Sequence, residues 1–298
     1  MESERNKIEK IETYTVPELE KQVRLSDFVP GIFKTITSHQ GMKKAIKAGL
    51  VKINGSIGFT GDYIKGGEVI ELYENSSIQN QKPSIDIKLQ IIFEDDYLAI
   101  INKPAGIVVS GNKKWTLENA LPKNIKLSNK PTALLRPEPI HRLDYPTSGA
   151  ILVGKTREAV LALNKLFEER NIEKTYFAVT IKSMPESGVI ESKIDDKSAK
   201  SFYKVINSVK SPKYQFLNLV QLTPHTGRRH QLRKHMSEMG NPILGDLLYG
   251  NQGEIVKGKG LYLHAFSLNF IHPFTNETVS VSVPLPKKFD KLFIDVAK

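Results

Sequence analysis

The sequence predicts an α+β protein with a mostly antiparallel, mixed sheet, preceded by a small separate domain. Short β-rich runs outnumber helical segments, from residues 91–93 through 176–181 to 279–283. One clear amphipathic helix is expected among them over residues 157–169, with Thr156 as its candidate N-cap. This excess of strands over helices is typical of an α+β fold.

The domain organisation follows from one linker. Residues 75–83 are polar and end in proline, which makes them the best linker in the chain. We expect this linker to join a small domain, residues 16–74, to a larger one, residues 84–298. The first 15 residues are polar and charged, and we expect them to form a loose arm.

The composition excludes several classes of protein. Cysteine is absent, so disulfides, thiolate metal sites and cysteine nucleophiles are excluded. No apolar run is long enough to span a bilayer, and residues 1–13 lack the apolar core of a signal peptide. We therefore expect a cytoplasmic protein with no membrane partner. A formal net charge of +11 favours a polyanion such as nucleic acid as the partner.

The centre of the small domain combines a helix with a hairpin. Met42, Ala45 and Ile46 recur at helical spacing, and Gly49 follows where a left-handed C-cap is expected. Asn54, followed by glycine, then predicts a tight turn after a short strand. The opposite face of the helix carries three lysines: Lys43, Lys44 and Lys47. Such a face is commonly only solvated, but three ammonium groups on one face are also able to follow an RNA backbone.

The densest group of polar residues in the larger domain is 141–149, which reads His-Arg-Leu-Asp-Tyr-Pro-Thr-Ser-Gly. Its proline and glycine predict a loop, and an apolar strand follows at once. The loop holds one carboxylate, Asp144, close to Arg142. These residues are compatible with a structural ion pair and turn cap or with a catalytic carboxylate, and by themselves they leave both open.

Residues 149–156 formally match the phosphate-binding pattern G-x4-G-K-[ST], but the match fails on physical grounds. A phosphate loop needs a flexible turn after a strand, with backbone N–H groups that converge on phosphate. Here the intervening residues are Ala-Ile-Leu-Val, which are typical of a buried strand, and a polar loop precedes them. We therefore expect no nucleotide cofactor, and an ATPase would depend on this rejected match.

A third polar cluster, residues 221–235, contains three histidines at intervals of five: His225, His230 and His235. On a helix such positions are about 140° apart, and no carboxylate lies among them, so we expect no metal site. Arg229 and Arg233, four residues apart, would share a helix face and are able to bind a phosphate or a carboxylate. The turn-rich segment 241–250 is expected to be structural.

Four stretches in this order resemble the RluA-type pseudouridine synthases, and the resemblance covers nearly the whole chain. They are 102–106 (Asn-Lys-Pro-Ala-Gly), 141–149, 174–176 (Lys-Thr-Tyr) and 226–233 (Thr-Gly-Arg-Arg-His-Gln-Leu-Arg) with a Gly-Asn-Pro-Ile-Leu-Gly-Asp tail. The departures are Gly154, where alanine is usual, and Arg229, where threonine or serine is usual. The small domain resembles an S4 RNA-binding domain, which is common in front of this family. That likeness lies in its Leu-Ser-Asp-Phe opening, its lysine-bearing helix and residues 49–55.

The resemblance implies conversion of uridine in RNA to pseudouridine, in which the C1′–N1 bond breaks, the uracil turns in place and C5 bonds to C1′. By motif position Asp144 is the catalytic carboxylate, which either attacks C1′ or removes the 2′ proton. Arg233 matches the basic partner that orients it. Tyr176 matches the tyrosine that stacks on the base and is suited to the C5 proton step. Arg142 matches the arginine that fills the stack when the target nucleotide leaves it.

The resemblance also implies the partners. We expect RNA contacts from Lys43, Lys44, Lys47 and Arg229. The RNA is expected to be large-subunit ribosomal RNA, the commonest substrate of members with an S4 domain, or else tRNA. The isomerisation changes no redox state and carries no group, so no cofactor is needed, and we expect a monomer.

A non-catalytic RNA-binding or ribosome-assembly factor with the same fold is the alternative. Such a protein would not need Asp144, Tyr176 and Arg233 together. All three residues are present, which favours the enzyme.

Overall fold

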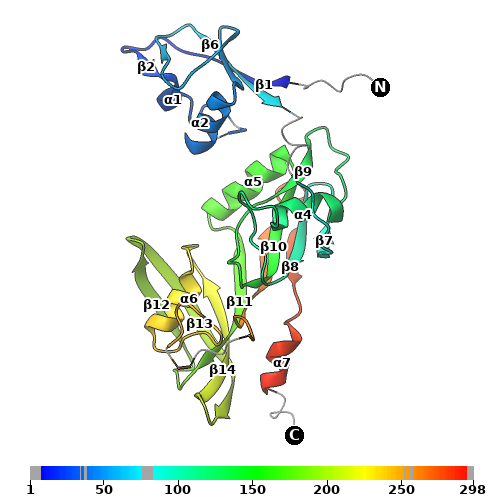
Figure 1. The fold of residues 1–298 in the computed structure, drawn as a ribbon, viewed down its shortest axis with the longest axis vertical. Helices are drawn as coiled ribbons and strands as arrows, with labels where there is room; N and C mark the ends of the chain where they lie inside the picture. Colours follow the sequence, from blue (N-terminus) through cyan, green and yellow to red (C-terminus); the bar gives the residue numbers. More distant parts are fainter. Residues whose placement is uncertain are drawn as a thin grey trace. The chain divides into compact units, whose positions relative to one another are not determined.

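The computed structural model describes residues 8–33, 35–36, 39–75, 83–251, 253–254 and 258–293 (Figure 1). The chain forms two compact units, Met1–Pro83 and Ser84–Lys298. Residues 76–82, most of the predicted linker, lie outside the described residues. In the described part of the chain, no helix is long and apolar enough to cross a membrane.

The first unit is built on a four-stranded antiparallel sheet with strand order β1-β6-β3-β4. Its strands are β1 (Ile8–Thr15), β3 (Val51–Ile53), β4 (Ser56–Ile57) and β6 (Val69–Asn75). A separate antiparallel pair consists of β2 (Val23–Arg24) and β5 (Tyr63–Ile64). The helices are α1 (Leu25–Phe28) and α2 (His39–Lys47).

The predicted helix and hairpin of this unit are confirmed. Met42, Ala45 and Ile46 of α2 are buried in the core of the unit. Gly49 follows with a φ of +68°, the left-handed conformation that ends a helix at glycine. Asn54 and the glycine after it both have positive φ, as the tight turn between β3 and β4 requires.

The prediction of a loose arm over residues 1–15 was wrong for residues 8–15. These residues form β1, which pairs with β6 along its whole length. Ile11 and Tyr14 pack against the core of the unit. The physical reason is that β6 would otherwise present an unpaired edge, whose backbone groups a polar segment satisfies as well as an apolar one. Residues 1–7 lie outside the described residues.

The second unit is organised by one ten-stranded sheet. Its main path runs β12-β13-β14-β11-β15-β10-β8-β7, with β16 beside β15 and β9 beside β10. Only β10 and β15 pair in parallel among the described strands, so the sheet is mixed and mostly antiparallel, as predicted. The strands are β7 (Gln90–Glu94), β8 (Leu98–Lys103), β9 (Ala133–Pro139), β10 (Ser148–Thr156), β11 (Glu173–Ile181), β12 (Ser187–Ile194), β13 (Lys197–Ser211), β14 (Gln215–Pro224), β15 (Leu263–Ile271) and β16 (Thr278–Ser282).

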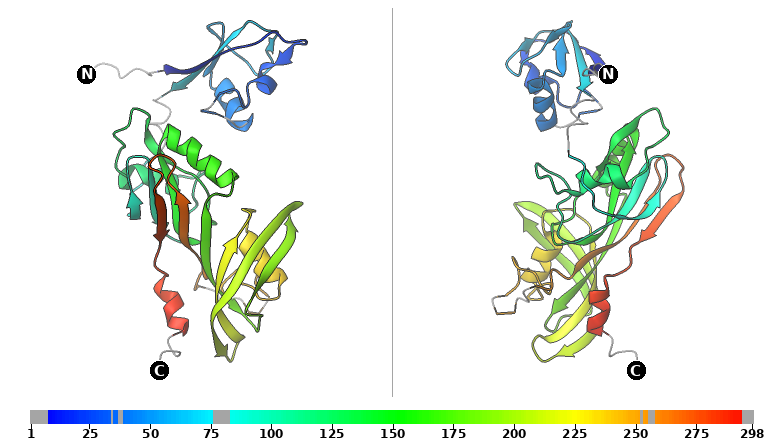
Figure 2. Two further views of the ribbon diagram at one scale, coloured as in Figure 1. Left: turned by 180° about the vertical axis from the view of Figure 1, so that it is seen from behind. Right: turned by 45° about the vertical axis from the view of Figure 1, so that its right-hand side comes forward.

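Within the described residues of this unit, four helices pack against parts of the sheet (Figures 1 and 2). They are α4 (Leu117–Asn124), α5 (Arg157–Glu168), α6 (Gln231–Glu238) and α7 (Lys287–Phe293). Helix α5 packs against β10 and β9, whereas α6 packs against β12, β13 and β14. Strand β11 lies between these two regions, so a side chain on β11 is within reach of residues from both.

The segment that mimics a phosphate loop is a buried strand, as the sequence predicts. Residues 149–156 belong to β10, and Thr156 is the N-cap of α5, where its Oγ1 accepts from the Ala159 N–H at 3.1 Å. Lys155 is 3% exposed, and its Nζ lies 2.8 Å from Glu94 Oε1. A lysine held in this way is not free to bind a nucleotide.

The start of β10 is fixed by a close approach of two strands. Gly149 has a φ of +114°, and a Cβ added there would lie 2.1 Å from the carbonyl oxygen of Ala265 in β15. Only glycine fits this crossing. The crossing therefore sets the position of the loop 141–147, which enters β10 immediately before it.

Candidate active site

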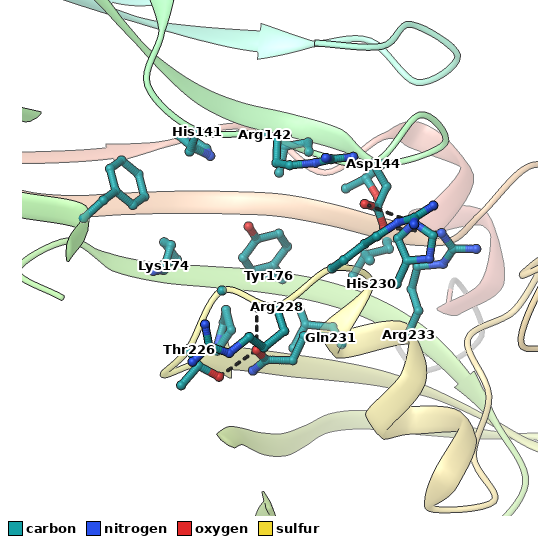
Figure 3. Close-up of a pocket in the computed structure, with 18 residues that line it drawn as sticks. His141, Arg142, Asp144, Lys174, Tyr176, Thr226, Arg228, His230, Gln231 and Arg233 are labelled. Atoms are coloured by element: carbon teal, nitrogen blue, oxygen red, sulfur yellow. Dashed lines mark hydrogen bonds and ion pairs between the residues drawn. The ribbon is translucent and has the colours of Figure 1, made fainter. Parts of the chain in front are cut away.

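One pocket of about 320 Å³ opens in the second unit (Figure 3). Three segments form most of its lining, and Phe167 of α5 and Leu263 of β15 complete it. The loop 141–147 forms one side and β11 the floor, while residues 224–233, from the end of β14 to α6, form the other side. Among the described residues that line it, Asp144 is the only carboxylate. The cations of the lining are Arg142, Lys174, Arg228, Arg229 and Arg233.

The loop that carries Asp144 is anchored from beneath. The Thr147 N–H donates to the Asp144 carbonyl at 3.0 Å, which closes a tight turn. The Nζ of Lys103, from β8, donates to the Thr147 carbonyl at 2.7 Å and to the Pro104 carbonyl at 3.0 Å. Burial lowers the pKa of Lys103 to about 8, against the opposing effect of the Asp144 charge. This anchor restricts where the Asp144 side chain can point.

Arg233 joins two carboxylates. Its Nε and Nη2 donate to the two carboxylate oxygens of Asp246, each at 2.7 Å, and its Nη1 lies 3.3 Å from Asp144 Oδ2. Burial would lower the pKa of Arg233, but the hydrogen bonds and charge of Asp246 and Asp144 raise it overall. Arg233 is therefore a fixed cation with one N–H edge directed at Asp144.

His230 approaches Asp144 from the other side. Its Nε2 lies 3.7 Å from Asp144 Oδ1, and its Nδ1 lies 2.8 Å from the Tyr249 hydroxyl. Burial lowers its pKa, against the raising effect of Asp144. A neutral His230 whose Nδ1 accepts from Tyr249 carries its proton on Nε2, which faces Asp144.

Tyr176 projects from β11 into the middle of the pocket (Figure 3). Its register partners are Leu222 on β14 and Ala265 on β15. Burial raises its pKa, and the charge of Asp144 raises it further. The phenol therefore stays protonated at neutral pH.

Comparisons with known proteins identify the family of this chain. Residues 97–238 match the RNA pseudouridylate synthase family. Over 286 residues, 86% of this chain, the protein is 30% identical to the ribosomal large subunit pseudouridine synthase D of Xanthomonas campestris, of which it covers 83%. The chain belongs to the RNA pseudouridine synthase family. The resemblance to RluA-type synthases that the motifs predict is thus confirmed.

Further relatives of this pseudouridine synthase carry different substrates in their names. The ribosomal large subunit pseudouridine synthase C of Rickettsia felis is 29% identical, with 91% of this chain and 96% of the relative covered. The tRNA pseudouridine synthase C of Haemophilus ducreyi is 35% identical, with 70% and 95% covered. The solved structure of human RNA pseudouridylate synthase domain containing 4 aligns with a TM-score of 0.55 at 26% identity. The alignment covers 67% of this chain and 90% of the human chain.

The structure brings together five of the predicted site residues of this synthase. Asp144, Tyr176, Arg233, Arg142 and Arg229 all line the pocket. The predicted proximity of Asp144 and Arg233, which are 89 positions apart, is confirmed. The remaining three, Lys43, Lys44 and Lys47, lie on the exposed face of α2 in the first unit.

The prediction that Arg229 shares a helix face with Arg233 was wrong. Helix α6 begins at Gln231, and His230 before it is left-handed, with a φ of +56°. Arg229 therefore lies in the preceding loop and is exposed. The helix starts late because the side-chain Oε1 of Gln231 accepts from the Thr226 hydroxyl at 2.7 Å and from the Arg228 N–H at 3.0 Å. These contacts hold residues 226–230 as a loop.

The three histidines of this region have separate partners. His225 Nε2 lies 3.1 Å from Arg170 Nη1, and His235 Nδ1 lies 3.0 Å from the Ser201 hydroxyl, whereas His230 contacts Tyr249. Across the described ranges, no group of three or more His, Asp or Glu side chains is arranged to hold a metal ion.

Sequence reasoning missed Asp246 and the contact of His230 with Asp144. Asp246 lies in the segment 241–250, which was predicted to be only structural, and it is 1% exposed. The available signal was a carboxylate that directly follows the apolar run Ile243-Leu244-Gly245. A buried carboxylate needs a cationic partner. In the sequence, the nearest arginine before Asp246 is Arg233, the last residue of the stretch 226–233.

Proposed function

We propose that this enzyme isomerises specific uridines of large-subunit ribosomal RNA to pseudouridine, with Asp144 as the catalytic carboxylate. The observation that carries the proposal is the position of Asp144. It is the one carboxylate among the described lining residues of a cationic pocket, 3.3 Å from Arg233 and 3.7 Å from His230. A single carboxylate in a cationic pocket suits a reaction at a sugar carbon of a polyanion.

The reaction needs one carboxylate for a physical reason. Cleavage of the C1′–N1 bond develops positive charge at C1′, which a nearby carboxylate stabilises or captures. The uracil leaves as a delocalised anion, turns, and bonds to C1′ through C5, and the C5 proton is finally lost while N1 gains one. No redox change occurs and no group is carried, so no cofactor is required.

The other lining residues support this step. Arg233 orients Asp144, and its own position is fixed by Asp246. We assign Tyr176 a stacking role against the uracil. Its raised pKa keeps it protonated, so it is not suited to accept the C5 proton at neutral pH. The exposed Arg142 lies at the pocket, where it is able to fill the RNA stack that the extruded nucleotide leaves.

The first unit is proposed to be an S4-like RNA-binding module. Its helix α2 presents Lys43, Lys44 and Lys47 to solvent on the face opposite the buried Met42, Ala45 and Ile46. The net charge of +11 supports a polyanion as the partner of the whole chain. Arg229, exposed in the loop before α6, is proposed as a further RNA contact.

A tRNA substrate is the second candidate, since a relative named as a tRNA pseudouridine synthase is 35% identical. Site mapping of pseudouridine in total RNA from cells with and without this protein distinguishes the two. We expect the loss of one or more pseudouridines from large-subunit ribosomal RNA. A loss confined to tRNA would replace the proposed substrate, and an unchanged map would contradict the proposed function.

A further inference from the structure

Lys174 lines the pocket but takes no part in the chemistry described above. It belongs to β11, two residues before Tyr176, so both side chains lie on the same face of the strand. Figure 3 shows Lys174 and Asp144 on opposite sides of Tyr176. The pocket therefore extends past the tyrosine to a second end, which Lys174 forms together with Phe167 and His141.

The neighbours of Lys174 leave its charge without a counter-ion. Its Nζ lies 5.4 Å from the centroid of the Phe167 ring. Burial lowers the pKa of Lys174, and the charge of Arg170 lowers it further. Among the described residues, Lys174 forms no ion pair with a carboxylate, and no carboxylate is among the causes that act on its pKa. A partly buried cation without a counter-ion is costly, so this end of the pocket favours an anionic ligand.

The groups next to Lys174 do not supply a counter-ion for its ammonium group. The carboxylate of Glu173, the preceding residue, accepts from the Asn269 side chain at 3.2 Å. His141 Nε2 accepts the Leu152 N–H at 3.0 Å, and burial together with the Lys174 charge lowers the pKa of His141 to about 3. His141 is thus neutral and already occupied. The anion that Lys174 is placed to bind must come with the ligand.

We propose that Lys174 forms a subsite for a backbone phosphate of the RNA, adjacent to the target uridine. The inference rests on the proposed function, which puts the uracil against Tyr176. Two residues along a strand span roughly 6.6 to 6.8 Å, a distance that the sugar and phosphate of one nucleotide can bridge. Phe167, beside the ammonium group, excludes water from one side and strengthens its attraction for the phosphate.

The test removes the charge of Lys174 and the charge of one RNA phosphate, first separately and then together. Lys174→Met removes the ammonium group and keeps the apolar stem. The probe is a synthetic RNA copy of the segment with the mapped pseudouridine or, where none is mapped, of a segment that wild type binds. A methylphosphonate replaces one phosphate at a time on either side of its central uridine. With unmodified RNA, we expect Lys174→Met to raise Kd about tenfold, the loss of one charge-assisted hydrogen bond. With one of the modified RNAs, wild type should lose the same factor and the variant should lose nothing more.

Three further measurements make the result specific. The salt dependence of Kd should flatten by about 0.7 to 0.9 in the variant, as expected for one lost phosphate contact. Lys174→Arg, which keeps a cation, should restore most of the affinity. Lys165→Met serves as the matched control, because Lys165 is 72% exposed on α5 and should bind RNA like wild type.

The outcomes separate this proposal from the proposed function. If every methylphosphonate weakens wild type and Lys174→Met by the same factor, Lys174 does not bind a flanking phosphate and the proposal is overturned. If wild type forms no pseudouridine in any RNA, the proposed function fails. The binding cycle still reports on the phosphate subsite in that case, since it measures affinity rather than turnover. At saturating RNA, Lys174→Met should keep kcat within about twofold of wild type and raise KM.

Discussion

At the scale of single residues, the site depends on how the guanidinium of Arg233 divides its hydrogen bonds between Asp246 and Asp144. Its bidentate contact with Asp246 uses two N–H groups at 2.7 Å, and only the longer contact of 3.3 Å reaches Asp144. Asp246 also accepts the N–H groups of Leu248 and Tyr249 at 3.0 and 3.1 Å. Asp246 is therefore fully engaged in structure, whereas Asp144 keeps one oxygen edge toward the pocket.

The first prediction concerns Asp144. Asp144→Asn is nearly isosteric but removes the charge that stabilises the anomeric centre. We expect pseudouridine formation to fall by more than about a thousandfold, with RNA binding largely kept. Asp86→Asn changes a carboxylate that is 87% exposed and should turn over like wild type. Turnover of purified Asp144→Asn near the wild-type rate would rule out the proposed mechanism.

The second prediction concerns Asp246. Asp246→Ala leaves the buried guanidinium of Arg233 with a single weak contact, and removing one partner of a buried ion pair costs about 3 to 5 kcal/mol. We expect the free energy of unfolding in urea to fall by this amount. Asp86→Ala breaks only the exposed pair with Lys123 and should leave the unfolding midpoint near that of wild type. Equal stability of the two variants would contradict a structural role for Asp246.

At the scale of elements, β10 and α5 are joined through His141. Its Nε2 accepts from the Leu152 N–H in β10, and its ring packs 4.8 Å from Phe167 of α5. This arrangement requires the neutral ring. Burial accordingly lowers the pKa of His141 from 6.5 to about 3.

The third prediction is the pH dependence that follows. Because the folded pKa of His141 lies below its unfolded value, its contribution to stability is complete above about pH 6.5 and is lost as the pH falls toward 3. The expected slope is about 1.4 kcal/mol per pH unit between pH 6 and 4. His141→Gln keeps an acceptor for the Leu152 N–H and should flatten this slope in urea unfolding. His225→Gln, at an exposed position, should keep the wild-type slope, and a wild-type slope in His141→Gln would contradict the prediction.

The fourth prediction belongs to helix α2. If Lys43, Lys44 and Lys47 each contact one phosphate, changing all three to alanine should reduce the salt slope of RNA binding by about two to three. A solvated lysine face predicts an unchanged slope. The matched control removes the same net charge from exposed positions of the second unit: Lys88, Lys123 and Lys126. Salt titrations of the α2 variant that overlay those of wild type would refute the contact.

At the scale of the whole molecule, the two units have separate cores and separate proposed tasks. The core of the first unit lies between α2 and the sheet of β1, β6 and β3, whereas the described residues that line the pocket belong to the second unit. We therefore expect the second unit alone to keep the catalytic rate but to bind RNA more weakly.

The fifth prediction follows from this division. Deletion of residues 1–83 should raise KM for the RNA about tenfold or more and leave kcat within about threefold of wild type. Single-turnover kinetics at saturating RNA separate the two effects. A fall in the rate of the bound step larger than the fall in affinity would show that the first unit contributes to catalysis.

The sequence by itself determined the features that depend on a few neighbouring residues. The N-cap of α5 at Thr156, the buried face of α2 and the turn at Asn54 follow from local propensity and spacing, which act over one or two helical turns. The rejection of residues 149–156 as a phosphate loop also rested on local chemistry, and the structure agrees because those residues are β10. The family and the motif residues could likewise be predicted from the sequence, since each motif is a short continuous segment.

Only the tertiary structure decided which distant residues meet. Residues 8–15 form β1 because they pair with β6, 54 to 67 positions away, and the sequence of 8–15 does not show which strand is its partner. Arg229 lies outside α6 because the side chain of Gln231 forms hydrogen bonds with the preceding loop and with β13. Its Nε2 donates to the Lys200 carbonyl at 2.9 Å. The pairing of Asp246 with Arg233, and of Arg233 with Asp144 across 89 positions, depends on the packing of α6 against the sheet. Propensity and periodicity depend on neighbours in the chain, whereas burial and charge pairing depend on neighbours in space, which only the folded structure brings together.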